Sequence, residues 1–227
     1  MENKDIKVAF AHNVYDRFKT LASTIHIERQ YFPDCQQSIT CNSRVNKKFF
    51  EGYENLEVKY FTETPQHKIG CTNGMLLACN MALEHDFDVL VFSHDDVVIN
   101  PEFYDVVEKH INSVFTNEYD VVCRNPSWLG TDILMMEVVF MNRKAVERLF
   151  SEIKLLKNDD EIGYYKYDKG KIHVNSISPE HWFFKKLTET DLNINVINFG
   201  LDKPDVEEIS RDMGYFHLNN GKRGWKD

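Results

Sequence analysis

The stretch Val89-Leu90-Val91-Phe92-Ser93-His94-Asp95-Asp96-Val97 decides the fold prediction. Its four leading residues form an apolar run, which is typical of a buried strand. Two adjacent carboxylates follow, at what would be the carboxyl end of that strand. In α/β proteins ligands bind at this end, and carboxylate oxygens are the ligands that hard divalent cations prefer. The stretch therefore predicts an α/β enzyme that holds a divalent metal against a phosphorylated ligand.

Strands and helices alternate on both sides of this stretch. Upstream, the pattern predicts strands over residues 6–11 and 56–61, a helix over residues 15–32, and a second helix that begins with Thr72 or Asn73 as its N-cap. Downstream, it predicts a helix that begins near Pro101, strands over residues 119–123 and 135–141, a helix over residues 144–155 and a last strand over residues 194–199. This alternation predicts a mostly parallel central sheet flanked by helices, a Rossmann-like arrangement.

The regular pattern weakens after about residue 157. Residues 158–171 are polar and aromatic, and we expect them to form a long surface excursion. Order returns at Ser178-Pro179-Glu180, which has the cap, the proline and the early acid of a helix start. No internal repeat and no linker composition interrupts the sequence, so residues 1–227 are expected to form one domain.

Composition excludes several classes of protein. With 227 residues and 42% apolar residues, the chain has enough apolar side chains for a full core. Its net charge of −9 gives no overall attraction to DNA or to an anionic membrane. The five cysteines have no CxxC spacing, so reduced, packed thiols are expected rather than a disulfide framework or a zinc knuckle. The apolar runs are too short to span a membrane, and the polar N-terminus lacks signal-peptide features, so we expect a cytoplasmic protein without stable membrane insertion.

Residues 70–101 resemble the nucleotide-sugar half of GT-A glycosyltransferases of the large family 2 type. The resemblance rests on the helix segment Ala78-Cys79-Asn80-Met81-Ala82, on the apolar strand, and on His94-Asp95-Asp96-Val97 with Pro101 beyond it. Gly74 stands at the position of the family's helix glycine. Cys79, Ala82 and His94 depart from the family's usual arginine, glycine and first aspartate, although a Phe-x-His-x-Asp-Val form resembles one branch of glycosyltransferase-like proteins.

The resemblance implies a GT-A fold with a nucleotide-sugar-binding half over residues 1–101 and an acceptor-binding half over residues 102–227. It implies Mn²⁺ or Mg²⁺ as cofactor, coordinated by Asp96 and completed by His217. Asp95 would contact the ribose or a metal-bound water, and His94 would pack beside the pair.

The resemblance also implies a donor site built by two loops. The loop after the first strand corresponds to Ala11, His12 and Asn13, and the loop before the glycine-containing helix corresponds to Lys68. A lysine near a diphosphate supplies charge and hydrogen bonds. Gly74 and Asn80 complete the predicted donor-binding residues through their positions in the family helix pattern.

The acceptor site is expected in the second half. In inverting members of the family a carboxylate at the start of a late helix removes the acceptor proton, which implies Glu180 as the base. Asp132 is a rival base on a loop that also carries Trp128. We expect this loop, together with the residues Glu137, His181 and Trp182, to contact the acceptor.

The resulting prediction is a metal-dependent glycosyltransferase that moves a sugar from a nucleotide sugar, most commonly UDP-linked in this family, to an acceptor hydroxyl with inversion. The acceptor could be a glycan, a protein or a modified nucleic acid. Two alternatives stay open. A catalytically degenerate GT-A-like module would bind a sugar or a partner, and a sugar nucleotidyltransferase would use a related sheet, although the glycine-rich N-terminal loop with arginine that is usual there is replaced by His12-Asn13-Val14. A haloacid-dehalogenase type of phosphoryl transfer would need an Asp-x-Asp after the first strand, where the sequence has none.

Overall fold

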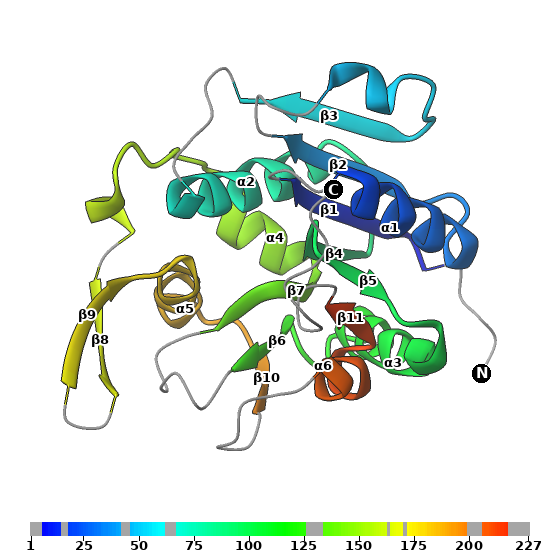
Figure 1. Ribbon diagram of the computed structural model, residues 1–227. Helices are drawn as coiled ribbons and strands as arrows, with labels where there is room; N and C mark the ends of the chain where they lie inside the picture. The colour runs from blue at the N-terminus through cyan, green and yellow to red at the C-terminus, as the bar shows by residue number, and fades with distance from the viewer. Residues whose placement is uncertain are drawn as a thin grey trace.

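A seven-stranded sheet forms the centre of the molecule (Figure 1). The computed structural model describes residues 6–14, 18–41, 46–61, 67–125, 134–162, 164–169, 172–198 and 206–217. The strands of the central sheet are β1 (Val8–Val14), β2 (Gln36–Cys41), β3 (Leu56–Tyr60), β4 (Val89–His94), β6 (Val121–Asn125), β7 (Met135–Asn142) and β10 (Ile194–Asn198). Their order across the sheet is β10-β6-β7-β4-β1-β2-β3.

All strands of this sheet run in one direction except β7. It is antiparallel to both of its neighbours, β4 and β6, whereas the other neighbouring pairs are parallel. Six strands therefore end at one edge of the sheet, and β7 begins there. The predicted mostly parallel α/β sheet is confirmed, and its carboxyl edge is where a ligand is expected to bind.

Helices cover both faces of the sheet (Figure 1). One apolar cluster joins alternate strand residues such as Ala9, Leu90 and Val139 to α2, α4 and α5. The strand residues on the other face, such as Phe10, Val91 and Phe140, pack with α3, with the last residue of α6 and with β11. The third cluster packs α1 on β1 and β2. The helices are α1 (Phe18–Tyr31), α2 (His67–Ala82), α3 (Tyr104–Phe115), α4 (Arg143–Phe150), α5 (Pro179–Thr188) and α6 (Val206–Met213), with short 3-10 helices at Lys47–Phe50, Pro101–Phe103 and Asp159–Glu161.

Two small antiparallel pairs complete the fold. β5 (Val97–Ile99) pairs with β11 (Tyr215–His217), and β8 (Tyr164–Lys169) pairs with β9 (Ile172–Ile177). The β8–β9 hairpin extends away from the main body (Figure 1). We expected residues 158–171 to form an irregular surface excursion, but much of that stretch belongs to this hairpin. Its strands lack a long apolar run, and they are held by pairing with each other.

Two further expectations about the elements need correction. Helix α2 begins at His67 rather than after Thr72 or Asn73, and both residues lie inside it. The Thr72 hydroxyl donates to the Lys68 carbonyl at 3.1 Å, one turn earlier, so it does not cap the helix. Strand β2 has no counterpart among the predicted elements, because its sequence Gln-Gln-Ser-Ile-Thr-Cys is largely polar. None of the helices that the structure describes is long and apolar enough to cross a membrane.

Candidate donor and metal site at the carboxyl edge

The acidic turn after β4 lies at the carboxyl edge of the sheet. β4 ends at His94, β5 begins at Val97, and Asp95 and Asp96 form the turn between them. The side chain of Asp95 is buried, whereas Asp96 is partly exposed. Thr24 of α1 donates from its hydroxyl to the Val97 carbonyl at 3.2 Å, so α1 holds the backbone directly after the turn.

Strand β11 brings the C-terminal part of the chain beside this turn. In the antiparallel pairing with β5, His217 is the partner of Val97. Tyr215 is fully buried and anchors the strand. Gly214 has a φ of +71°, and a Cβ there would lie 2.5 Å from Val107 Cγ2, so glycine permits both the turn and the close approach of α3. The backbone of His217 thus lies next to the acidic turn, while its side chain is outside what the structure describes.

A cysteine and a histidine face each other next to the turn. Cys71 Sγ of α2 lies 3.6 Å from His94 Nε2, and the His94 ring packs edge-on against Phe92 with 5.3 Å between centroids. Burial alone would lower the pKa of His94, but interactions with Cys71 and with the two turn carboxylates outweigh burial and raise the pKa to about 10. Acidic groups therefore dominate the electrostatics at the end of β4, a condition that attracts cations.

Helix α2 is fastened to β1 and β2 at the same edge. The Thr40 hydroxyl of β2 donates to the Gly74 carbonyl at 3.0 Å. Asn13 Nδ2 lies 3.5 Å from the carbonyl oxygens of Gly70 and Cys71. A Cβ at residue 74 would lie only 2.0 Å from Asn13 Oδ1, so glycine makes this approach possible. Asn13 and Gly74, both predicted as donor-binding, thus hold the first half of α2 at the carboxyl edge.

His12 is occupied inside the protein. Its Nδ1 lies 3.0 Å from Ser93 Oγ, its Nε2 lies 3.0 Å from Glu28 Oε2, and its side chain is fully buried. Because side chains alternate between the two faces of β1, His12 points toward α1 and away from α2. Because both ring nitrogens already have partners, His12 has a structural role here, and a direct contact with the donor is not proposed.

Two other residues predicted to bind the donor, Ala11 and Asn80, have structural roles instead. Ala11 is fully buried beneath α2, and Asn80 lies on α2, where its Nδ2 donates to the Phe150 carbonyl at 2.8 Å and ties α2 to α4. Neither is proposed as a donor contact. Lys68 differs from them, because it is partly exposed in the first turn of α2.

The start of α5 reaches the same edge. The backbone N–H of Leu134, just before β7, donates to the Glu180 carbonyl at 3.3 Å, and β7 begins at the carboxyl edge. The Glu180 side chain is partly exposed and accepts a hydrogen bond from the Ser178 hydroxyl. The structure therefore places Glu180, the predicted base, near the carboxyl edge of the sheet.

Of the residues predicted to contact the acceptor, two are buried and two lie outside the described part of the chain. Trp182 is 7% exposed and packs in the core, so its predicted stacking on a sugar is not supported by its position. His181 is also buried and stacks on Phe184, with 6.2 Å between ring centroids. Trp128 and Asp132 lie outside the described residues.

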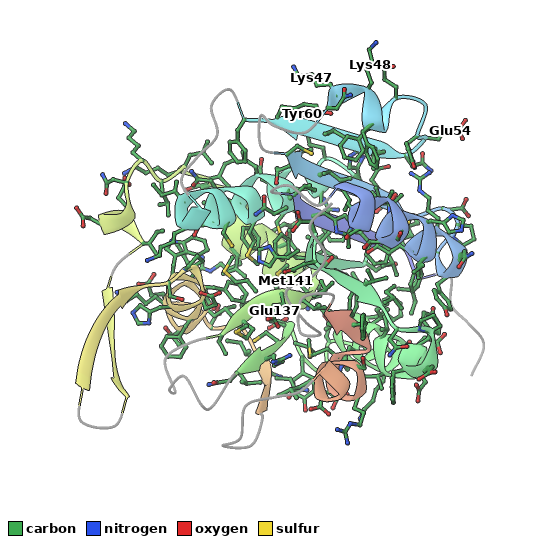
Figure 2. The ribbon with its side chains drawn as sticks, viewed as in Figure 1. Lys47, Lys48, Glu54, Tyr60, Glu137 and Met141 are labelled. Atoms are coloured by element: carbon green, nitrogen blue, oxygen red, sulfur yellow. The ribbon has the colours of Figure 1, made fainter. Side chains whose placement is uncertain are left out.

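Glu137 forms an ion pair that the sequence analysis did not predict. Its Oε2 lies 3.5 Å from Nη1 of Arg124, a buried arginine near the carboxyl end of β6. In Figure 2, Glu137 lies near the centre of the view, whereas Lys47 and Lys48 lie at the top, beside β3. A charged residue inside an otherwise apolar strand, as in Val121-Val122-Cys123-Arg124, is the signal that could have identified Arg124.

The carboxylate oxygens of Asp95 and Asp96 are suitable ligands for a hard divalent cation. Among the described residues, no group of three or more His, Cys, Asp or Glu side chains could hold a metal by itself. Mg²⁺ usually binds through one or two carboxylates together with substrate phosphates, so a two-carboxylate turn is chemically sufficient when a diphosphate completes the shell.

The sheet has six parallel strands and one antiparallel strand, β7, and helices cover both of its faces. The chain is similar to the structure of a glycosyltransferase involved in the glycosylation of the major capsid of PBCV-1, with a TM-score of 0.55 and 10% identity over 96% of both chains. At this identity the likeness shows a common fold. The predicted GT-A-like fold class is thereby confirmed.

Two further similarities have lower scores. S. aureus TarS has a TM-score of 0.49 and 12% identity over 86% of this chain, which spans 36% of the length of TarS. The inositol-1-phosphate CTP transferase from T. maritima has a TM-score of 0.47 and 11% identity over 87% of both chains. No family model matches the sequence, and no curated protein matches it.

Proposed function

We propose that this protein transfers a sugar from a nucleotide-sugar donor, with UDP-linked donors first, to an acceptor hydroxyl in a metal-dependent, inverting reaction. The observation that carries the proposal is the Asp95–Asp96 turn at the carboxyl edge, with the His217 backbone paired beside it. The fold is shared with a glycosyltransferase, which supports the same chemistry.

Asp96 is the proposed cation ligand because it is the more exposed carboxylate of the turn, and His217 is its proposed partner. Asp95 would orient the ribose or a metal-bound water. When bound, Mn²⁺ or Mg²⁺ stabilises the charge that develops on the departing diphosphate. Lys68 would add positive charge, and the backbone N–H groups of the first turn of α2 would add hydrogen-bond donors for the phosphates.

Glu180 is the proposed base. Its carboxylate would accept the proton of the acceptor hydroxyl as the oxygen attacks the sugar carbon, and the Ser178 hydroxyl would hold the carboxylate in place. Asp132 is the alternative base. It follows Trp128 closely in the sequence, and both residues lie outside the described part of the chain. A small glycan or a soluble protein partner is the proposed acceptor, since the net charge of −9 opposes binding to duplex nucleic acid.

The first test is Asp96→Asn. We expect release of UDP from UDP-sugars in the presence of Mn²⁺ to fall by about 100-fold or more, because the cation loses its carboxylate ligand. The fold should persist, since Asp96 is partly exposed and not part of the core. Asp105→Asn, an exposed acid in the first turn of α3, is the control and should retain activity. Full activity of Asp96→Asn would refute the metal assignment.

The second test is Glu180→Gln. We expect binding of the nucleotide sugar to be retained while transfer slows by about 100-fold or more, the usual range for loss of a general base. Binding is measured by calorimetry and transfer by mass spectrometry of the acceptor. Unchanged transfer would exclude Glu180 as the base. Formation of a nucleotide sugar from a nucleoside triphosphate and a sugar 1-phosphate would instead assign the chain to the nucleotidyltransferases.

A further inference from the structure

Cys71 differs from the other four cysteines in its exposure. Cys35, Cys41, Cys79 and Cys123 are buried, whereas Cys71 is partly exposed. Burial raises the pKa of Cys35 and of Cys123 to about 12, which leaves those thiols protonated at neutral pH. Since the thiolate is the metal-binding form of cysteine, Cys71 is the cysteine best placed to bind a metal.

The distance between Cys71 and His94 matches a pair of ligands on one cation. Zinc–sulfur and zinc–nitrogen bonds of about 2.3 and 2.0 Å at a tetrahedral angle put the two ligand atoms about 3.5 Å apart. Cys71 Sγ and His94 Nε2 are 3.6 Å apart. Both side chains are partly exposed, so a cation would reach them from solvent.

We propose that Cys71 and His94 are two ligands of a thiophilic divalent cation, of which Zn²⁺ is the physiological candidate. Imidazole and thiolate select borderline and soft metals, whereas the neighbouring carboxylates of the turn suit Mg²⁺ and Mn²⁺. The remaining coordination positions are open to water or to an anionic ligand. This site goes beyond the proposed function and does not depend on it.

The surroundings of the pair favour a cation. Helix α2 and β4 hold the two side chains from opposite sides, and the closeness of Asn13 to the Cys71 carbonyl fixes the α2 backbone at this point. Asp95 and Asp96 follow His94 directly along the chain and add negative charge beside the pair. Because cysteine binds a metal as the thiolate and histidine binds it as the neutral imidazole, metal binding here releases protons and strengthens as pH rises.

The same separation also suits a weak hydrogen bond between thiol and imidazole, so the experiment must detect sulfur ligation directly. We propose titrating the full chain, without nucleotide, with Co²⁺ as a spectroscopic substitute for Zn²⁺. The expected result is a thiolate-to-cobalt charge-transfer band in the near ultraviolet that saturates at one equivalent and is removed by Zn²⁺. Cys71→Ser should lose the band.

Two matched pairs of variants make the test specific. His94→Gln should weaken Co²⁺ binding by more than about 100-fold, because loss of an outer partner of a ligand already costs 10–100-fold. His85→Gln, a partly exposed histidine that pairs with Glu57, should leave the titration unchanged, as should Cys35→Ala. Either the absence of a charge-transfer band in the wild type or a band that persists in Cys71→Ser would overturn the proposal.

The outcome is independent of the proposed transferase activity. Mn²⁺-dependent nucleotide binding without a cobalt–thiolate band would refute the Cys71–His94 site and leave the function standing. A band that requires Cys71, in a protein that binds no nucleotide, would establish the site and refute the function.

Discussion

The side chains of His12 and Glu28 are fully buried and lie against each other beneath the carboxyl end of β1. Gln37 Nε2 donates to the same Glu28 oxygen, Oε2, at 2.9 Å, and Arg29 Nε donates to Gln37 Oε1 at 2.8 Å. These contacts connect β1, β2 and α1 through side chains alone. A buried ionisable pair is costly to break, because removal of one partner leaves the other without compensation.

We expect Glu28→Ala to lower the free energy of unfolding by about 3–5 kcal/mol, the usual cost of breaking a buried pair. Urea denaturation measures the change. Glu84→Ala, an exposed acid just after α2, is the control and should stay within about 0.5 kcal/mol of the wild type. A loss below about 1 kcal/mol for Glu28→Ala would show that the pair does not hold these elements together.

Asp120 is a second polar junction, at the opposite edge of the sheet. Its Oδ1 accepts from Asn142 Nδ2 at 2.8 Å, and its Oδ2 accepts from the Asn193 N–H at 2.9 Å and from Lys144 Nζ at 3.0 Å. Burial opposes ionisation of Asp120, but these hydrogen bonds outweigh burial and lower its pKa. The junction joins the starts of β6, α4 and β10.

The lowered pKa of Asp120 predicts a pH dependence with a definite sign. The stabilisation is complete above about pH 4, where an unfolded aspartate is ionised, and it is lost as pH falls through the lower pKa of the folded state. Asp120→Asn should be about 1–3 kcal/mol less stable than the wild type near neutral pH. The difference should shrink below pH 4 in chemical denaturation. A difference that is constant down to pH 2 would contradict this account.

At the scale of elements, the position of α2 connects the core to the site. The sequence predicts the apolar face formed by Met75, Leu76 and Cys79, because its spacing is helical. It does not predict the first turns of α2, which are polar and lack an early apolar repeat. Nor does it predict that Asn73 exchanges two hydrogen bonds with the backbone of Leu156, at 2.8 and 3.0 Å.

We expect Gly74→Ala to push α2 away from β1, because the new methyl group would meet Asn13 Oδ1. Overpacking of this kind costs about 1–3 kcal/mol. The double variant Asn13→Ala, Gly74→Ala provides room for the methyl group, so the cost of the glycine replacement should largely disappear in that background. A double-mutant cycle in urea measures this coupling. Equal costs in both backgrounds would contradict the close approach seen here.

The candidate site was predictable where the sequence places its residues next to one another. Asp95 and Asp96 directly follow an apolar strand, so their location at a strand end could be inferred. The facing of Cys71 and His94 could not, because it depends on how α2 packs on β4. The burial of His12 could not be predicted either, since the sequence of the first strand does not show that His12 meets Glu28 of α1.

At the scale of the whole molecule, the two halves of the chain meet at one edge of the sheet. The N-terminal half supplies Asn13, the first turns of α2 and the acidic turn, and the C-terminal half supplies the start of α5 and β11. The division at residue 101 into a nucleotide-sugar-binding half and an acceptor-binding half remains a prediction. In the structure, β4 of the first half pairs with β7 of the second half inside one sheet. Metal, donor and acceptor groups would therefore be assembled by a single folding unit.

The most direct test of the central claim is a thermal-shift measurement on the wild-type chain. UDP, GDP, CMP and dTDP and their sugar conjugates are compared in Mn²⁺ and in chelator. We predict that one nucleotide, UDP first, raises the melting temperature with Mn²⁺ and not with chelator, because a ligand that binds only the folded state stabilises it. No shift with any nucleotide in Mn²⁺ would contradict the proposed donor site.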